Sequence, residues 1–140
     1  MRVETKITPR YAETDKMGII HHAVYPIYYE IGRTDFCKEL GLPYHIIEER
    51  GITQALVNLD IKYKRPAKYG DELVLITTLN RYDKITCEFY YEIYNQENEL
   101  INTGTTRLAW LDRNTLKLIS LNKHHKDILE MLEAAKEPRN

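Results

Sequence analysis

The sequence has few cysteines, no long apolar run and no apolar segment at its start. Only two of its 140 residues are cysteines, which excludes a disulfide framework and a four-thiolate metal site. No apolar run approaches the roughly 20 residues that a membrane helix requires, and residues 1–5 lack the apolar core of a signal peptide. We therefore expect a cytoplasmic protein without a membrane span, in which Cys37 and Cys87 are reduced.

The sequence also lacks an excess of either charge, because 20 Lys and Arg residues balance 21 Asp and Glu residues. This balance gives no general attraction to nucleic acid, so any recognition of an anion must be local. Hydrophobic residues make up 43% of the chain, and no repeat or low-complexity tract divides it, which predicts one domain over residues 1–140. Eleven tyrosines against two phenylalanines suit half-wet surfaces such as pockets and subunit interfaces.

The apolar pattern predicts a short strand, two helices and then a series of strands. Alternation over 3–7 predicts the first strand. Residues 26–40 suit a helix, with Pro26 in its first turn and Gly41 after its last, and apolar residues on most of its sides predict that it is buried. A second short helix is expected around residues 44–50.

From residue 57 onward the apolar period falls to two, which predicts strands. The first, over residues 57–63, has the alternation of a strand with one wet face, and turns are expected at 80–84 and 95–98. Connections this short exclude crossover helices, so the strands are mostly antiparallel. The predicted class is α+β, a long antiparallel sheet wrapped around one helix. Further strands are expected at 73–79, 85–94 and 100–111. The apolar residues at 128, 129 and 132 have the spacing of a helix.

The loop before the long helix holds the residues that carry chemistry. Its pattern is Asp15 with Gly18 three residues later, two apolar residues, His22-Ala23-x-Tyr25, and an aromatic-rich helix containing Glu30 and Gly32-Arg33-Thr34. This pattern resembles the hotdog-fold acyl-CoA thioesterases of the 4-hydroxybenzoyl-CoA thioesterase type, and the likeness continues at 63–73 and 104–109, in order, across about residues 5 to 120.

The resemblance implies a hotdog fold that pairs across a dimer into one continuous sheet, with active sites at the subunit boundary and CoA along the surface. It implies a homo-oligomer, either a dimer or a homotetramer of two dimers, that hydrolyses an acyl-CoA without a metal or redox cofactor. The family's catalytic carboxylate falls on Asp15, and the backbone N–H that polarises the thioester carbonyl falls on His22, with the N–H of Ala23 next to it.

Elementary chemistry makes these roles reasonable. An aspartate is ionised at neutral pH, so Asp15 can attack the thioester carbonyl or accept a proton from an attacking water, and the sequence does not choose between the two. The first N–H groups of a helix lack intrahelical partners and carry partial positive charge, which suits an oxyanion. An aspartate before a glycine is also a common turn residue that caps its own backbone.

Four further residues are expected to contact the substrate: Gly18 and Tyr25 in the loop, and Lys64 and Arg65 in the local basic cluster that also contains Lys62 and Lys68. Lysine and arginine suit the phosphates of CoA, although exposed lysines also protect an edge strand from aggregation. Gly104 lies inside a strand pattern, which indicates either a bulge or the close approach of a ligand.

Several alternatives remain at this point. The His22 ring either transfers protons or merely packs, Glu30 and Arg33 either form an ion pair or support the loop, and Cys37 is expected to be inert. The pairs His21-His22 and His124-His125 are weak candidates for metal ligands, because adjacent side chains diverge. A hotdog hydratase or dehydratase, and a non-catalytic acyl-CoA or acyl-carrier binding protein, are the two competing functions.

Overall fold

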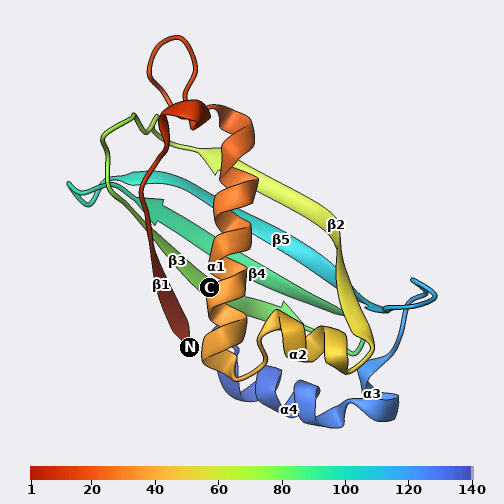
Figure 1. The fold of residues 1–140 in the computed structure, drawn as a ribbon. Coiled ribbons are helices and arrows are strands. Elements are labelled where there is room, and N and C mark those ends of the chain that lie inside the picture. The colour runs from red at the N-terminus through yellow and green to blue at the C-terminus, as the bar shows by residue number, and fades with distance from the viewer. Residues whose placement is uncertain (140) are drawn as a thin grey trace.

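A computed structural model describes residues 1–139 and shows an antiparallel five-stranded sheet that curves around one long helix (Figure 1). The spatial order of the strands is β1-β3-β4-β5-β2. This arrangement confirms the predicted α+β class and its hotdog form. The strands are β1 (Arg2–Ile7), β2 (Ile52–Tyr63), β3 (Leu73–Tyr82), β4 (Thr86–Tyr94) and β5 (Leu100–Asp112); the helices are α1 (Tyr25–Leu40), α2 (Tyr44–Glu49), α3 (Leu121–His124) and α4 (Lys126–Ala135), and 3-10 turns occupy η1 (Tyr11–Glu13) and η2 (His22–Val24).

Helix α1 begins and ends where the sequence predicts. Pro26 sits in the first turn, where a missing N–H costs nothing, and Gly41 ends the helix in the left-handed region with φ of 88°. The expectation of a buried helix is wrong on one side, because Ile27 and Ile31 remain 54% and 40% exposed. They lie one turn apart, so α1 presents an apolar stripe that the described residues, 1–139, leave uncovered.

Two glycines let α1 approach the sheet closely. A Cβ on Gly32 would lie 2.6 Å from the Leu75 side chain on β3, and a Cβ on Gly104 of β5 would lie 2.5 Å from the Tyr29 ring. The Tyr29 ring stacks on Tyr91 with centroids 4.2 Å apart, and its hydroxyl donates to Asn102 Oδ1 at 2.5 Å. Gly104 therefore accommodates a tyrosine of the chain's own helix, neither a bulge nor a ligand.

Strand β2 differs most from its prediction. It begins at Ile52, earlier than expected, and its middle is exposed on both faces, where the alternation predicts one wet face. Leu56, Val57 and Leu59 are 50%, 56% and 39% exposed. The physical reasons are a shift of register between Leu56 and Asn58, which interrupts the alternation, and the position of β2 at the edge of the sheet, away from β1 and β3, on which α1 packs.

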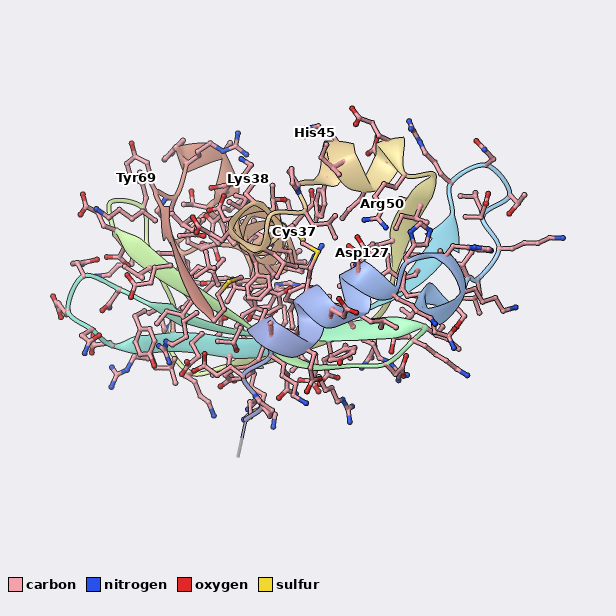
Figure 2. All side chains as sticks on the ribbon, turned by 90° about the horizontal axis from the view of Figure 1, so that it is seen from below. Cys37, Lys38, His45, Arg50, Tyr69 and Asp127 are labelled. Carbon is pink, nitrogen blue, oxygen red and sulfur yellow. The ribbon has the colours of Figure 1, made fainter. Side chains whose placement is uncertain are left out.

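The lower end of the sheet is closed by the C-terminal helices. Ile128 and Leu132 of α4 are buried, as their helical spacing predicts. Arg50, at the end of α2, forms a bidentate pair with Asp127 of α4, with both N–O distances at 2.7 Å; Figure 2 shows these two side chains facing each other. Within residues 1–139, no helix combines the length and the apolar character needed to cross a membrane.

Substitution of Gly104 by alanine tests the close approach. Because the new methyl group would meet the Tyr29 ring and the Asp60 carbonyl at 2.5 and 2.8 Å, we expect the free energy of unfolding to fall by about 2 kcal/mol. Urea denaturation measures this change. Thr105→Ala on the neighbouring, outward-facing position is the control, with an expected change within about 0.5 kcal/mol. Equal effects of the two substitutions would contradict the packing described here.

Candidate active site

The loop that carries the expected catalytic residues is an irregular hairpin anchored to the segment before β3. Thr14 pairs with Ile20 as an antiparallel bridge, and the Asp15 N–H donates to the Ile19 carbonyl at 2.8 Å. The Ile20 N–H donates to the Ala67 carbonyl at 2.8 Å. Figure 1 shows this loop projecting past the N-terminal end of α1. The hairpin thus holds Asp15 and the entrance of α1 on one short, tethered segment.

The carboxylate of Asp15 uses its two oxygens differently. Oδ1 accepts hydrogen bonds from the Met17 N–H at 2.8 Å and the Ile19 N–H at 3.2 Å, so the turn-capping interpretation of this residue is part of its structure. Within residues 1–139, Oδ2 makes no hydrogen bond, and the side chain is half-buried. Gly18 completes the turn with φ of 75°, a conformation that favours glycine.

At the entrance of α1, His21 and His22 make backbone and ring contacts. The Ala23 N–H donates to His21 Nδ1 at 3.2 Å, so one of the two backbone groups expected to face an oxyanion already has a partner. The His22 N–H has no hydrogen bond within the part of the chain that the structure describes. The His22 carbonyl accepts a hydrogen bond from the Tyr63 hydroxyl at 2.8 Å, and the exposed ring of His22 stacks on the ring of His21. Tyr63 was not expected to have this role.

Glu13 is a second residue that sequence reasoning missed. It is 9% exposed, and its Oε1 accepts from the Tyr28 hydroxyl and the Arg10 N–H, both at 2.8 Å. Burial alone would raise the pKa of Glu13, but the hydrogen bonds from Arg10 and Tyr28 and the Arg10 charge outweigh burial and lower it. The buried carboxylate therefore ties the start of the loop to α1. No local pattern signals the Tyr28 partner.

The four residues expected to contact substrate are placed in different ways. Lys64 is exposed, whereas Arg65 pairs with Glu99 at 3.0 Å. Tyr25 is only 2% exposed and makes edge contacts with Tyr28 and Tyr63, with ring centroids 5.9 and 5.8 Å apart. In this chain its ring therefore packs beneath the helix entrance instead of facing a substrate.

Glu30 and Arg33 do not form the ion pair that was one of their two alternatives, within residues 1–139. The reason is the direction of the Arg33 side chain, which turns toward the sheet, where Nη1 donates to the Tyr91 hydroxyl at 3.3 Å. Its hydrogen bonds go to the sheet and none to the Asp15 loop. Burial alone would lower the pKa of Arg33, but the neighbouring Tyr91 and Tyr44 hydroxyls more than offset it and raise the pKa.

The remaining candidates take no part in this site. Cys37 is a free, buried thiol whose pKa burial raises to about 12, so the sulfur stays protonated at neutral pH. Among residues 1–139, no group of three or more His, Cys, Asp or Glu side chains has the arrangement of a metal site. What the loop offers is an aspartate oxygen and a backbone N–H at a helix entrance, which are the two groups that acyl transfer requires.

Comparison with known proteins places this geometry in a wider group. A family model described as "Thioesterase-like superfamily" matches residues 9–133. The chain is 37% identical over 137 residues to a putative acyl-CoA thioesterase, YneP, of Bacillus subtilis (strain 168), covering 97% of this chain and 99% of the relative. Its structure resembles the DHNA-CoA thioesterase of Staphylococcus aureus with a TM-score of 0.90 and 34% identity, over 95% and 89% of the two chains. The hypothetical protein TT1821 of Thermus thermophilus is similar at a TM-score of 0.85 and 34% identity, over 98% and 99%.

The buried carboxylate of Glu13 predicts a pH-dependent stability. A carboxylate whose pKa is lowered by folding stabilises the protein above its unfolded pKa of about 4.5, and this contribution disappears as the pH falls through the folded value. We expect Glu13→Gln to lower the free energy of unfolding by about 1–2 kcal/mol at pH 7. The difference from the wild type should shrink below pH 4.5. Denaturant titrations between pH 3 and 7 measure it, with the exposed Glu4→Gln as control, and a difference independent of pH would contradict the assignment.

Proposed function

The chain belongs to the thioesterase-like superfamily, and from this premise we propose that it hydrolyses the thioester of an acyl-CoA to the free acid and CoA. The identity to YneP over almost the full length of both proteins supports this function. The high structural similarity to a DHNA-CoA thioesterase supports it independently. The observation that carries the mechanism is the carboxylate of Asp15, of which one oxygen holds the loop and the other has no partner within residues 1–139.

In this mechanism the free Oδ2 of Asp15 performs the chemistry. It either attacks the thioester carbonyl to form a mixed anhydride, which water then hydrolyses to the free acid and the Asp15 carboxylate, or takes a proton from a water that attacks the carbonyl directly. CoA leaves as a thiolate in both routes. The two N–H groups on Oδ1 hold the carboxylate in one orientation. Such anchoring reduces the freedom that an attacking group must lose in the transition state.

The N–H of His22 stabilises the oxyanion. It lies in the first turn of η2, directly before α1, where backbone N–H groups carry partial positive charge. The hydrogen bond from Tyr63 to the His22 carbonyl orients the neighbouring peptide, and the His21 ring keeps the Ala23 N–H occupied. A single donor of this kind stabilises a transition state by about 3 kcal/mol. Because a thiolate is a good leaving group, one backbone donor and one carboxylate are sufficient for hydrolysis of the thioester.

Exposed lysines beside the loop bind the phosphates of CoA. Lys62 lies in β2 directly before Tyr63, the last residue of the strand, and Lys64 follows the end of the strand. Lys68 forms a bridge with Ile19 of the loop that carries Asp15. No salt bridge engages these three side chains within residues 1–139, whereas Arg65 is partly neutralised by Glu99. We therefore assign the phosphate contacts to the lysines, with Lys64 closest in sequence to the Tyr63 contact.

The exposed edge of β2 forms a homodimer. Leu56, Val57 and Leu59 lie on an edge whose backbone groups face away from β5, and the apolar stripe of Ile27 and Ile31 lies on the uncovered side of α1. Pairing of two β2 edges buries these side chains and produces one continuous sheet. It also places the two helix entrances at the subunit boundary. A homotetramer would add a second contact between such dimers.

The competing functions are less well supported. A hydratase or dehydratase needs a histidine that shuttles protons beside a carboxylate, but the His22 ring stacks on His21 and forms no ion pair with a carboxylate within residues 1–139. A non-catalytic acyl-CoA binding protein has no use for the free oxygen of Asp15. Thermal stabilisation by acyl-CoA without release of thiol is the result that would favour such a binding protein.

Asp15→Asn tests the catalytic carboxylate without removing the turn. The asparagine keeps an oxygen that accepts the Met17 and Ile19 hydrogen bonds but loses the charge. We expect kcat for thiol release to fall by about 10²-fold or more while the melting temperature stays close to the wild type. Asp15→Ala, which also removes the cap, should lower both. Full hydrolytic activity in Asp15→Asn would refute the assignment.

The dimer predicts a coupling of assembly and activity. Introducing Val57→Asp and Leu59→Asp places charges on the β2 edge, so we expect a monomer by sedimentation analysis and a loss of thioesterase activity of at least about tenfold. Leu118→Asp is the control, because Leu118 is more exposed, at 64%, than Val57 and Leu59 but does not belong to this edge. Retention of the dimer in the double variant would contradict the proposed interface.

A further inference from the structure

The carbonyl of His22 has a hydrogen-bond partner that comes from a distant part of the chain. An α-helical hydrogen bond to this carbonyl would come from the N–H four residues later, but that residue is Pro26, which has no N–H. The hydroxyl of Tyr63 donates to the carbonyl at 2.8 Å. The Tyr63 ring also contacts the buried ring of Tyr25, with centroids 5.8 Å apart. Tyr63 therefore supplies the contact that Pro26 leaves open.

Tyr63 is held by the rest of the fold on one side. It is the last residue of β2, and within residues 1–139 this strand has one neighbour, β5, through Asn102 at this position. The side chain of Tyr63 remains 52% exposed. Local stability is low where few apolar contacts are buried, as at the end of an edge strand. The Tyr63 hydroxyl can fix the His22 carbonyl only as firmly as the end of β2 is itself fixed.

The side chains of β2 determine how a second copy of the chain can pair with this edge. Before the register shift in the middle of the strand, Ile52 and Gln54 point to the helix side of the sheet; after the shift, Ile61 and Tyr63 do. Two antiparallel β2 strands that pair over their full length place residue 52 opposite residue 63, and residue 54 opposite residue 61. The full-length register therefore also keeps the two faces matched, which a slip by one residue would not.

We infer that a second copy of the chain completes the oxyanion site through Tyr63. In the full-length register Ile52 of the partner subunit lies opposite Tyr63, so the end of β2 is held on both sides. The Tyr63 hydroxyl then fixes the His22 carbonyl, and the N–H of His22 keeps one orientation toward the thioester carbonyl. Tyr63 is a positioning residue, because it touches His22 and not the reacting atoms. This inference rests on the proposed thioesterase function and adds to it the way in which assembly regulates the same site.

Tyr63→Phe tests the positioning role, because it removes the hydroxyl and keeps the ring. The substrate is whichever of acetyl-, octanoyl-, palmitoyl- and benzoyl-CoA the wild-type protein hydrolyses fastest. We expect kcat to fall about tenfold while KM stays within about twofold, since the contact acts on the transition state. The dimer should be unchanged in sedimentation analysis.

Tyr94→Phe is the matched control for Tyr63→Phe. Tyr94 also ends a strand, β4, and its hydroxyl donates to Glu92 at 2.9 Å. We expect kcat of Tyr94→Phe to stay within about twofold of the wild type. An unchanged kcat in Tyr63→Phe, or an equal fall in both variants, would overturn the inference.

The edge variant Val57→Asp/Leu59→Asp separates the link to assembly from a purely local role of Tyr63. If the partner subunit acts through Tyr63, adding Tyr63→Phe to this monomeric variant should change kcat by less than about twofold, because the contact is already ineffective. Dilution of the wild-type protein through dissociation gives the same comparison without new charges. The fall in kcat on dissociation should then be about tenfold smaller in Tyr63→Phe. A tenfold effect of Tyr63→Phe in the monomer, or equal falls on dilution, shows that Tyr63 works without the partner and removes the inference.

Proline at position 22 tests whether Tyr63 acts through the His22 N–H. His22 is the first residue of η2, and His21 before it has φ of −62° and ψ of 137°, a conformation that a following proline permits. His22→Pro therefore deletes the N–H, whereas His22→Ala keeps it. We expect Tyr63→Phe to lower kcat about tenfold in the His22→Ala background and by less than about twofold in the His22→Pro background. Equal effects in both backgrounds contradict the assigned route.

The measurements distinguish failure of this inference from failure of the thioesterase function. Thiol release by the wild-type protein together with full kcat in Tyr63→Phe removes the role of Tyr63 and leaves the hydrolysis intact. A wild-type dimer that releases thiol from none of the four esters refutes the thioesterase function, and the inference falls with it.

Discussion

The close approach of α1 to the sheet is the constraint on which the rest of the structure depends. Gly32 brings the helix against Leu75, and Gly104 makes room on β5 for the Tyr29 ring, which stacks on Tyr91. Packing at contact distance fixes the rotation of α1 about its axis. The same rotation determines that Arg33 faces inward, that Ile27 and Ile31 face outward, and that the entrance of α1 meets Tyr63.

The polar side chains of the loop before α1 hold it against the rest of the fold. Asp15 caps two N–H groups with one oxygen, and Glu13 binds Arg10 and Tyr28 in a buried position. Charge-assisted hydrogen bonds of this kind are stronger than neutral ones. A loop held in this way on a packed scaffold presents its remaining oxygen and its free N–H in a defined orientation, which is what electrostatic catalysis requires.

Two features remain incomplete in the isolated chain, and they lie on the same side of α1. The β2 edge exposes apolar side chains, and the cavity at Arg33 opens between α1, α2 and β2. In the proposed assembly the first is completed by a second subunit.

The sequence by itself determined the element order, the bounds of α1 and the antiparallel sheet, because these follow from local periodicity and from Pro26 and Gly41. It also located the loop with Asp15 and His22. Only the tertiary structure decided that Gly104 faces Tyr29, that Glu13 binds Tyr28, that Arg33 turns inward away from Glu30, and that β2 is exposed on both faces. The physical reason is that these features depend on contacts between residues far apart in the chain, which periodicity does not encode.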